Sequence, residues 1–262
     1  MVRRYVYLLR SSWPRLLELI YWPAVQLLTW GFLQNFITQS AQADGFAAGK
    51  VGLAAGAFIG AMLLWEILFR GQLGFSISFL EEMWSRNMGN LLMSPLRPAE
   101  FVLALMTMSV LRLTIGLVPV TGLAWLLFGY DFWSLGFAIP LFFANLIGTS
   151  WAVGLVVSGL ILRNGMGAES IAWTLLFLMM PLACVYYPVA VLPLWLRPFA
   201  WALPPTYVFE GLRAAAFDGA LRLDLMAWAA ALNVAYFIVA TMIFLRLLQS
   251  ARRAGSLVQM GE

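Results

Sequence analysis

The sequence predicts an all-α membrane protein with six transmembrane helices in one domain that spans residues 1–262. Hydrophobic residues make up 63% of the chain and charged residues only 11%, and the mean hydropathy is +0.86. Soluble domains do not have such a composition. Because a helix needs about 20 apolar residues to cross a bilayer, we expect spans in the apolar runs at roughly 17–38, 51–75, 99–128, 135–162, 170–187 and 224–248.

The distribution of basic residues agrees with six spans. With both termini in the cytoplasm, most arginines fall on the cytoplasmic side, where basic residues concentrate in membrane proteins. A seventh span would carry the tail residues Arg252 and Arg253 outward, so six spans are favoured. The basic residues that fall on the outer side are Lys50, Arg197, Arg213 and Arg222.

Residues 1–15 form a basic amphipathic leader. Arg3, Arg4 and Arg10 lie opposite an apolar stripe at helical spacing, until Pro14 interrupts the pattern. We expect this leader to form a helix in the inner membrane interface. It serves either as a plain basic anchor or as a platform for a cytoplasmic partner. The apolar stripe consists of Val2, Tyr5, Val6, Leu9 and Trp13.

A second amphipathic segment, residues 80–95, lies between the second and third apolar runs. Ser94 and Pro95 end it, and Pro98 begins the next helix, so we expect a separate surface helix. A rigid helix between two spans can transmit force, or it can simply rest among the headgroups. Its apolar face is predicted to hold Leu80, Met83, Trp84, Met88, Leu91 and Leu92, and its polar face Glu81, Glu82, Ser85, Arg86 and Asn90, with Glu82 and Arg86 as an i,i+4 pair.

Prolines interrupt the apolar segment 188–219, so it does not form a straight span. We expect a re-entrant segment of two short helices that dip into the membrane from outside. Glu210 and Arg213 lie one turn apart in it, and they form either an outer gate or a plain ion pair. Tyr186 and Tyr187 precede the segment and either belong to the interfacial aromatic belt or line a route for substrate. The interrupting residues are Pro188, Pro193, Pro198, Pro204 and Pro205.

Three charged residues fall within or beside the expected spans, where charge is costly and often functional. They are Glu66, Arg70 and Arg112. Glu66 and Arg112 lie equally far from the ends of two antiparallel spans, which makes them one candidate pair. Glu66 and Arg70 are the other, at i,i+4 spacing. A structural role for these charges is favoured over direct contact with substrate.

Several classes of site are disfavoured. The chain has no histidine and one cysteine, so metal centres, disulfides and acid–base catalysis lack their usual residues. The nearest phosphate-loop pattern, residues 45–50, is one residue short between its glycines, and Val51 stands where Ser or Thr would bind Mg²⁺. We expect no cofactor on this chain, no enzymatic activity and no nucleic-acid partner.

Two stretches together resemble the permeases of type-2 ABC exporters. One is EEMWSRNMGNLLMSP, residues 81–95, which looks like the coupling helix of that family. The other, residues 186–213, has an aromatic-Pro-x-x-x-Leu-Pro start, a Pro-x-Thr-Tyr centre and a Glu-x-x-Arg end, like the family's segment between its last two spans. The resemblance implies coupling through Glu81, Glu82, Trp84, Arg86 and Asn87, and an outer gate that includes Tyr186, Tyr187, Pro188, Pro193, Glu210 and Arg213.

The resemblance also implies partners and a location. Two copies of an ATP-binding subunit, with ATP and Mg²⁺ bound there, would drive a pair of permeases, most simply a homodimer, among the lipids of a bacterial inner membrane. The substrate would be an amphipathic, glycan-type or drug-like molecule moved outward. The alternative is an ion-coupled secondary transporter or channel, for which Glu66 is the candidate mid-membrane carboxylate.

Overall fold

The computed structural model describes residues 1–43, 48–85, 87, 97–165, 167 and 169–254, and for residues 41, 42, 48–55, 169 and 252–254 it describes the backbone alone. All regular structure in these ranges is helical. The 3-10 turns are η1 (Phe132–Leu135) and η3 (Val189–Val191). The α-helices are α1 (Val2–Arg10), α2 (Trp13–Ala43), α3 (Ala48–Trp84), α5 (Pro98–Phe128), α6 (Ala138–Asn164), α7 (Glu169–Leu182), α8 (Arg197–Trp201), α9 (Pro204–Asp218) and α10 (Leu223–Ala254).

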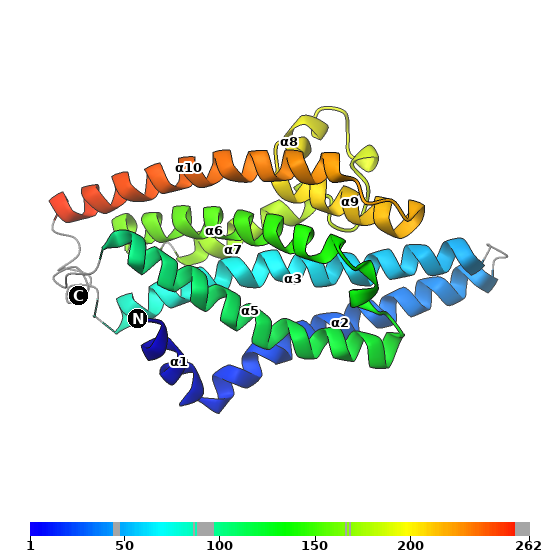
Figure 1. Cartoon of the computed structure of the whole chain (residues 1–262), viewed down its shortest axis with the longest axis horizontal. Coiled ribbons are helices and arrows are strands. Elements are labelled where there is room, and N and C mark those ends of the chain that lie inside the picture. Colours follow the sequence, from blue (N-terminus) through cyan, green and yellow to red (C-terminus); the bar gives the residue numbers. More distant parts are fainter. Residues whose placement is uncertain (44–47, 86, 88–96, 166, 168, 255–262) are drawn as a thin grey trace.

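Five of these helices, α2, α3, α5, α6 and α10, are long and apolar enough to cross a membrane, which confirms five of the expected spans. The N-terminus and the end of α10 lie at one end of the bundle, called the α1 end below. The lobe that contains α8 lies toward the other end, called the α8 end (Figure 1). This arrangement agrees with an even number of crossings.

The run at 170–187 forms a shorter helix than expected. Its helix α7 has 14 residues, which gives a length of about 21 Å against a hydrocarbon core of about 30 Å. The helix ends at Leu182 because Cys184 takes a left-handed backbone conformation with φ of 53°. The sixth crossing, by α7 and the residues after it, stays a prediction.

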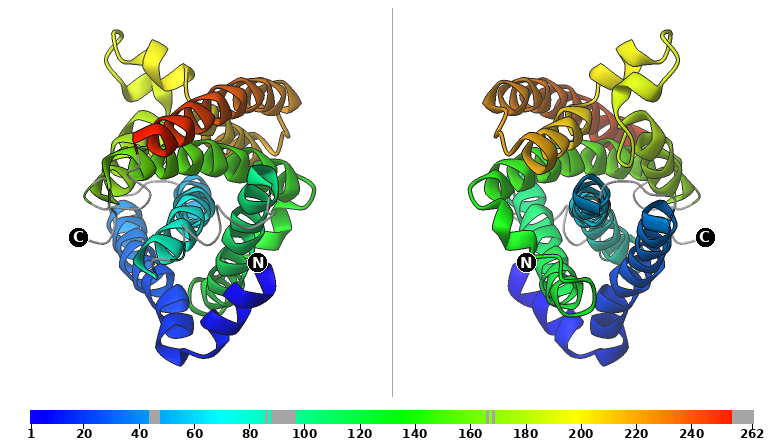
Figure 2. Two further views of the ribbon diagram at one scale, coloured as in Figure 1. Left: turned by 90° about the vertical axis from the view of Figure 1, so that its left-hand side faces the viewer. Right: turned by 90° about the vertical axis from the view of Figure 1, so that its right-hand side faces the viewer.

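Helix α3 is the centre of the bundle. Within its most apolar stretch 89% is buried, compared with 17% in α2 and 22% in α10. Views along the bundle show α2, α5 and α6 around α3, and α10 outside α6 (Figure 2). Gly74 allows α5 to approach closely, since a Cβ there would lie 3.0 Å from the Ser109 backbone. The outer apolar faces of α2 and α10 are therefore available to lipid or to another subunit.

Polar side chains join α6 to its neighbours inside the bundle. Thr149 donates a hydrogen bond of 2.7 Å to Asn233 of α10, and the Asn233 amide donates one of 2.9 Å to the Asn145 carbonyl. Ser150 donates to the Leu68 carbonyl of α3 at 2.9 Å. Each buried polar group thereby gains a partner that lipid cannot supply.

Residues 183–222 form a lobe at the α8 end, of which the part with η3 and α8 is visible as the yellow protrusion in Figure 2. The prolines interrupt the segment as expected, and two of them also begin helices, since Pro198 in α8 and Pro204 in α9 lie within the first turn. Val208 and Phe209 of α9 are buried in the bundle core. The segment contains the helices α8 and α9, and its entry into the membrane as a re-entrant segment stays a prediction.

Candidate coupling and gating sites

At the α1 end, the prediction that a separate surface helix begins at residue 80 is wrong for the first residues of that segment. Leu80 to Trp84 continue helix α3 without interruption. No glycine or proline lies between Gly74 and Gly89, so nothing in the sequence stops the helix at residue 80. Residues 86 and 88–96, which include Arg86, Asn90 and Pro95, lie outside the described residues, as does the expected pair of Glu82 with Arg86.

The faces of this last turn also differ from the prediction. Leu80 and Met83 are buried as expected, but Trp84 is 51% exposed and the whole of Glu82 is buried. Glu82 can lie inside because Arg4 compensates its charge and Asn87 donates a hydrogen bond to it. Arg4 Nη1 lies 3.0 and 2.9 Å from its two carboxylate oxygens, and Asn87 Nδ2 donates to it at 2.8 Å. A buried carboxylate is tolerated when it is paired and hydrogen-bonded in this way.

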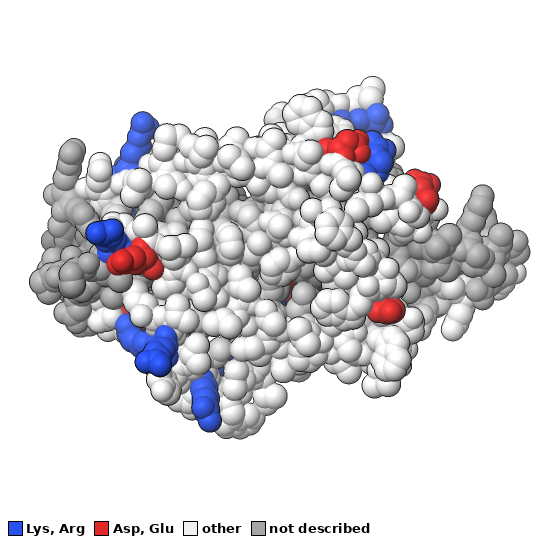
Figure 3. Space-filling view, viewed as in Figure 1, with Lys and Arg blue, Asp and Glu red and all other residues white. Residues whose placement is uncertain are grey.

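Glu81 forms the second half of the same network. Arg112 of α5 donates to Glu81 at 2.7 Å, and both side chains are nearly buried. Arg15 of α2 lies 3.4 Å from the other oxygen and is largely exposed. Arginine and acidic side chains lie together at this end on the face seen in Figure 3. The adjacent carboxylates Glu81 and Glu82 thus tie α1, α2 and α5 to the end of α3.

Tyr5 of α1 lies beside this network. The side chain is only 1% exposed. Burial raises the pKa of Tyr5 far above its ordinary value, and the Glu82 carboxylate raises it further because a phenolate beside it would be repelled. Helix α1 is therefore anchored by both an ion pair and a buried aromatic ring, with Arg4 and Tyr5 as adjacent residues.

Inside the bundle, the charges pair differently from the first hypothesis. Glu66 binds Arg70 at 2.6 Å, and Arg112 binds Glu81, so the Glu66–Arg112 pair is wrong and the Glu66–Arg70 alternative is confirmed. Side chains tilt toward the N-terminus of their own helix. Because α3 and α5 run in opposite directions, Arg112 points toward the α1 end and Glu66 toward the α8 end. The equal depth expected from the sequence is also not found, since Gly74 of α3 packs against Ser109 of α5, which places Arg112 nearer to the α1 end than Glu66.

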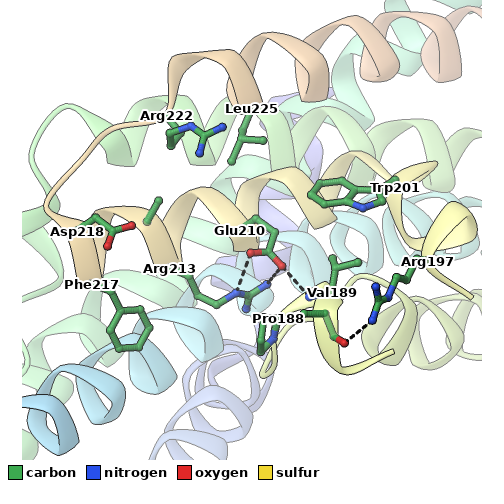
Figure 4. A pocket seen from close by; sticks show the side chains of 12 residues that line it. Pro188, Val189, Arg197, Trp201, Glu210, Arg213, Phe217, Asp218, Arg222 and Leu225 are labelled. Atoms are coloured by element: carbon green, nitrogen blue, oxygen red, sulfur yellow. Dashed lines mark hydrogen bonds and ion pairs between the residues drawn. The ribbon is translucent and has the colours of Figure 1, made fainter. Parts of the chain in front are cut away.

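At the α8 end, the lobe encloses an open cavity of about 770 Å³ (Figure 4). The Glu210–Arg213 pair, 3.1 Å apart, lies on its wall. Glu210 also accepts a hydrogen bond of 2.8 Å from the Val189 amide, and Arg213 donates to the Val185 carbonyl at 3.4 Å. The predicted ion pair therefore exists, and it fastens the loop after α7 to α9.

The other residues of the predicted gate are not all in one place. Pro188 lines the cavity, while Pro193 is not among its lining residues. Tyr186 turns inward, where its ring lies 5.1 Å from that of Trp30 on α2 and 4.9 Å from that of Phe58 on α3. Tyr187 instead donates a hydrogen bond to the Pro181 carbonyl at 2.7 Å. Only Pro188, Glu210 and Arg213 come together at the cavity.

The family comparison covers most of this architecture. The sequence model of the ABC-2 type transporter matches residues 9–217, from the end of α1 to the end of α9. The chain belongs to the ABC-2 type transporter family. A comparison with curated proteins gave no match.

As an ABC-2 permease, the chain is a non-catalytic membrane subunit, and such permeases pair with ATPase subunits. Across the described residues, no three His, Cys, Asp or Glu side chains gather where they could hold a metal ion. Sequence reasoning found the acidic residues of the coupling segment but missed their partners Arg4 and Arg15. The signal for them was present: two adjacent carboxylates at a membrane border need nearby cations.

Proposed function

We propose that this permease exports an amphipathic, glycan-type or drug-like substrate, powered by two copies of a separate ATP-binding subunit. It works as a homodimer in a bacterial inner membrane, with both termini in the cytoplasm. The observation that carries the proposal is the family match together with the end of α3, where a network of charges meets the segment that resembles a coupling helix.

In this proposal the α1 end is cytoplasmic and receives the ATPase. Trp84, which is exposed, and Arg86 and Asn87, which follow it, contact the partner. Glu81 and Glu82 do not contact the partner directly in this proposal. Their carboxylates hold α1, α2 and α5 to α3. A displacement of the coupling segment then moves four helices together. The buried α3 carries that displacement toward the α8 end.

The lobe at the other end acts as the outer gate. Glu210 and Arg213 hold the loop after α7 against α9, and Tyr186 at the start of that loop packs on α2 and α3. A shift of α3 against α2 would disturb this aromatic contact. The gate is therefore connected to the helix that begins the coupling segment.

Affinity purification of the tagged chain from its own host in mild detergent tests the partner. We expect an ATP-binding subunit in equimolar amount, with ATP hydrolysis in the eluate. Elution of the permease alone, repeated after crosslinking and without ATPase activity, would contradict the proposal and direct attention to ion coupling through Glu66.

Substitution of Arg86 by Glu tests the coupling segment. We expect loss of transport with normal membrane insertion, because an inverted charge at the contact repels the partner surface. Arg163→Glu is the matched control, since Arg163 is exposed in the last turn of α6. Retained export in Arg86→Glu, or equal loss in both variants, would remove the coupling role from this segment.

A further inference from the structure

The cavity in the lobe has an unusual charge balance. Three arginines and two acidic residues line it: Arg197, Arg213, Arg222, Glu210 and Asp218. Two of these arginines have carboxylate partners, since Arg213 pairs with Glu210, and Arg222 pairs with Asp224 at 2.6 Å. Within the described ranges no ion pair reaches Arg197. Its charge is therefore not compensated by a carboxylate in these ranges.

The guanidinium of Arg197 is fixed by the backbone. Its Nε donates to the Leu192 carbonyl at 3.0 Å and its Nη2 to the Ala190 carbonyl at 2.7 Å. These bonds use two of the five N–H groups of an arginine. Because the fork is already held in place, little side-chain entropy is lost when the remaining N–H groups bind an anion.

Neither acidic residue of the cavity forms an ion pair with Arg197. Glu210 is neutralised by Arg213 and accepts the Val189 amide. Asp218 lies toward the opposite end of the cavity from Arg197, beside Phe217 (Figure 4). An anion at Arg197 thus lies on the same side of the cavity as Trp201 and far from the exposed carboxylate of Asp218 (Figure 4).

Three exposed apolar residues lie near Arg197 in the sequence. Leu194, Trp195 and Phe199 are 77%, 70% and 61% exposed, although they are large apolar or aromatic side chains. They flank Arg197 in the sequence, within the lobe of a chain that spans the membrane. Exposed apolar and aromatic side chains around an arginine are typical of the membrane interface, where the phosphate groups of lipids lie.

We propose that Arg197 binds the phosphate group of a membrane phospholipid, whose acyl chains lie along the apolar edge formed by Leu194, Trp195 and Phe199. The guanidinium fork matches phosphate oxygens in shape and charge. The site would hold the lobe at a fixed depth in the leaflet at the α8 end. Lipid binding at this site needs neither the ATPase nor a transported substrate, so this proposal does not depend on the proposed function.

Photolabelling of the full-length purified chain tests the site. The probe is phosphatidylglycerol with a diazirine next to its phosphate, added to phosphate-free maltoside micelles, and adducts are mapped by peptide sequencing. We expect adducts within residues 188–201. Arg197→Gln should reduce them at least about tenfold, the equivalent of one lost charged hydrogen bond. Arg222→Gln is the matched control, because Asp224 already occupies that arginine, and its labelling should equal wild type.

Two further probes identify the source of the phosphate. Diacylglycerol with the same diazirine lacks the phosphate and should leave these residues unlabelled, and equal labelling would overturn the role of Arg197. Loss of phosphatidylglycerol labelling in millimolar glycerol 3-phosphate would assign the site to a soluble anion and overturn the lipid proposal. If Arg197→Gln does not fold, as judged by circular dichroism, Arg197→Lys replaces it. Lysine lacks the fork, so we expect several-fold weaker labelling, and wild-type labelling overturns the proposal.

Discussion

Glu81 accepts from two arginines in different environments, so one carboxylate offers an internal comparison. Arg112 approaches to 2.7 Å with 9% of its side chain exposed, whereas Arg15 lies at 3.4 Å with 52% exposed. The buried contact should matter for stability, because loss of one partner leaves a charge without compensation in a medium of low dielectric constant. The exposed contact is screened by water.

We therefore expect Arg112→Ala to lower the free energy of unfolding by about 3 kcal/mol. Arg15→Ala should lower it by less than about 1 kcal/mol. Chemical unfolding of the purified protein in detergent measures both. Equal effects of the two substitutions would show that the Arg112–Glu81 contact contributes no more to the free energy of unfolding than the exposed contact does.

The Glu66–Arg70 pair gives a second prediction at this scale. Glu66 is fully buried and Arg70 nearly so. Glu66→Leu should lower the free energy of unfolding by about 3 kcal/mol or more, because it leaves the arginine without its carboxylate partner. The double variant Glu66→Leu, Arg70→Leu should have a free energy of unfolding close to that of wild type. The same unfolding measurement decides. A double variant as unstable as the single one would mean that Glu66 or Arg70 has a further partner.

At the scale of elements, α1 is joined to α3 and not simply laid against the membrane. Tyr5 and Leu9 are buried, and Arg4 reaches Glu82. The apolar stripe of the leader thus packs on protein at these two positions. These contacts within the chain do not test the two expectations for the leader, a plain basic anchor or a platform for a cytoplasmic partner, and both stay predictions.

Alkaline pH should loosen this attachment. The pKa of Tyr5 is raised in the folded protein above its unfolded value of about 10. The neutral phenol therefore contributes its stability in full below about pH 10, and this contribution declines as the pH rises further, by up to about 1.4 kcal/mol per pH unit. Unfolding measured from pH 8 to 11 should show a smaller decline in Tyr5→Phe than in wild type. Tyr7→Phe, at a residue 71% exposed, should decline like wild type.

Helix α7 is the element whose membrane position is open to a direct test. If it completes the sixth crossing, Gly167 before it and Ala190 after it face opposite sides of the membrane. Cysteines at these exposed positions should then react differently with a membrane-impermeant maleimide in intact cells. We expect Ala190→Cys to be labelled and Gly167→Cys to be protected until the membrane is opened. Wild type is the control because its only cysteine, Cys184, is buried. Labelling of both on one side would mean that α7 does not cross.

At the scale of the whole molecule, α3 links the two ends of the bundle. It carries Glu81 and Glu82 at the α1 end and Phe58, which contacts Tyr186, toward the α8 end. Because α3 is the most buried of the long helices, its neighbours would have to adjust to any movement along its axis. This arrangement suits a permease in which a force at one end changes the packing at the other.

The sequence by itself determined the all-helical membrane class, five of the spans, the amphipathic first helix and the proline-broken lobe. These features follow from local composition and spacing, since apolar length and prolines act on a chain wherever it lies. The Glu210–Arg213 pair was also predictable, because its members lie one turn apart on one helix.

Only the tertiary structure decided which distant charges meet. Glu82 is buried because Arg4, 78 residues away in sequence, reaches it. Arg112 binds Glu81 and not Glu66 because α3 and α5 pack with Gly74 against Ser109, which places Arg112 nearer to the α1 end than Glu66, and its side chain points toward that end. Helix length and rotation in the assembled bundle set these contacts, and neither is encoded in the spacing of residues along a single segment. The sequence therefore fixes which charges are available, and the packing of α3 against α1, α2 and α5 selects their partners.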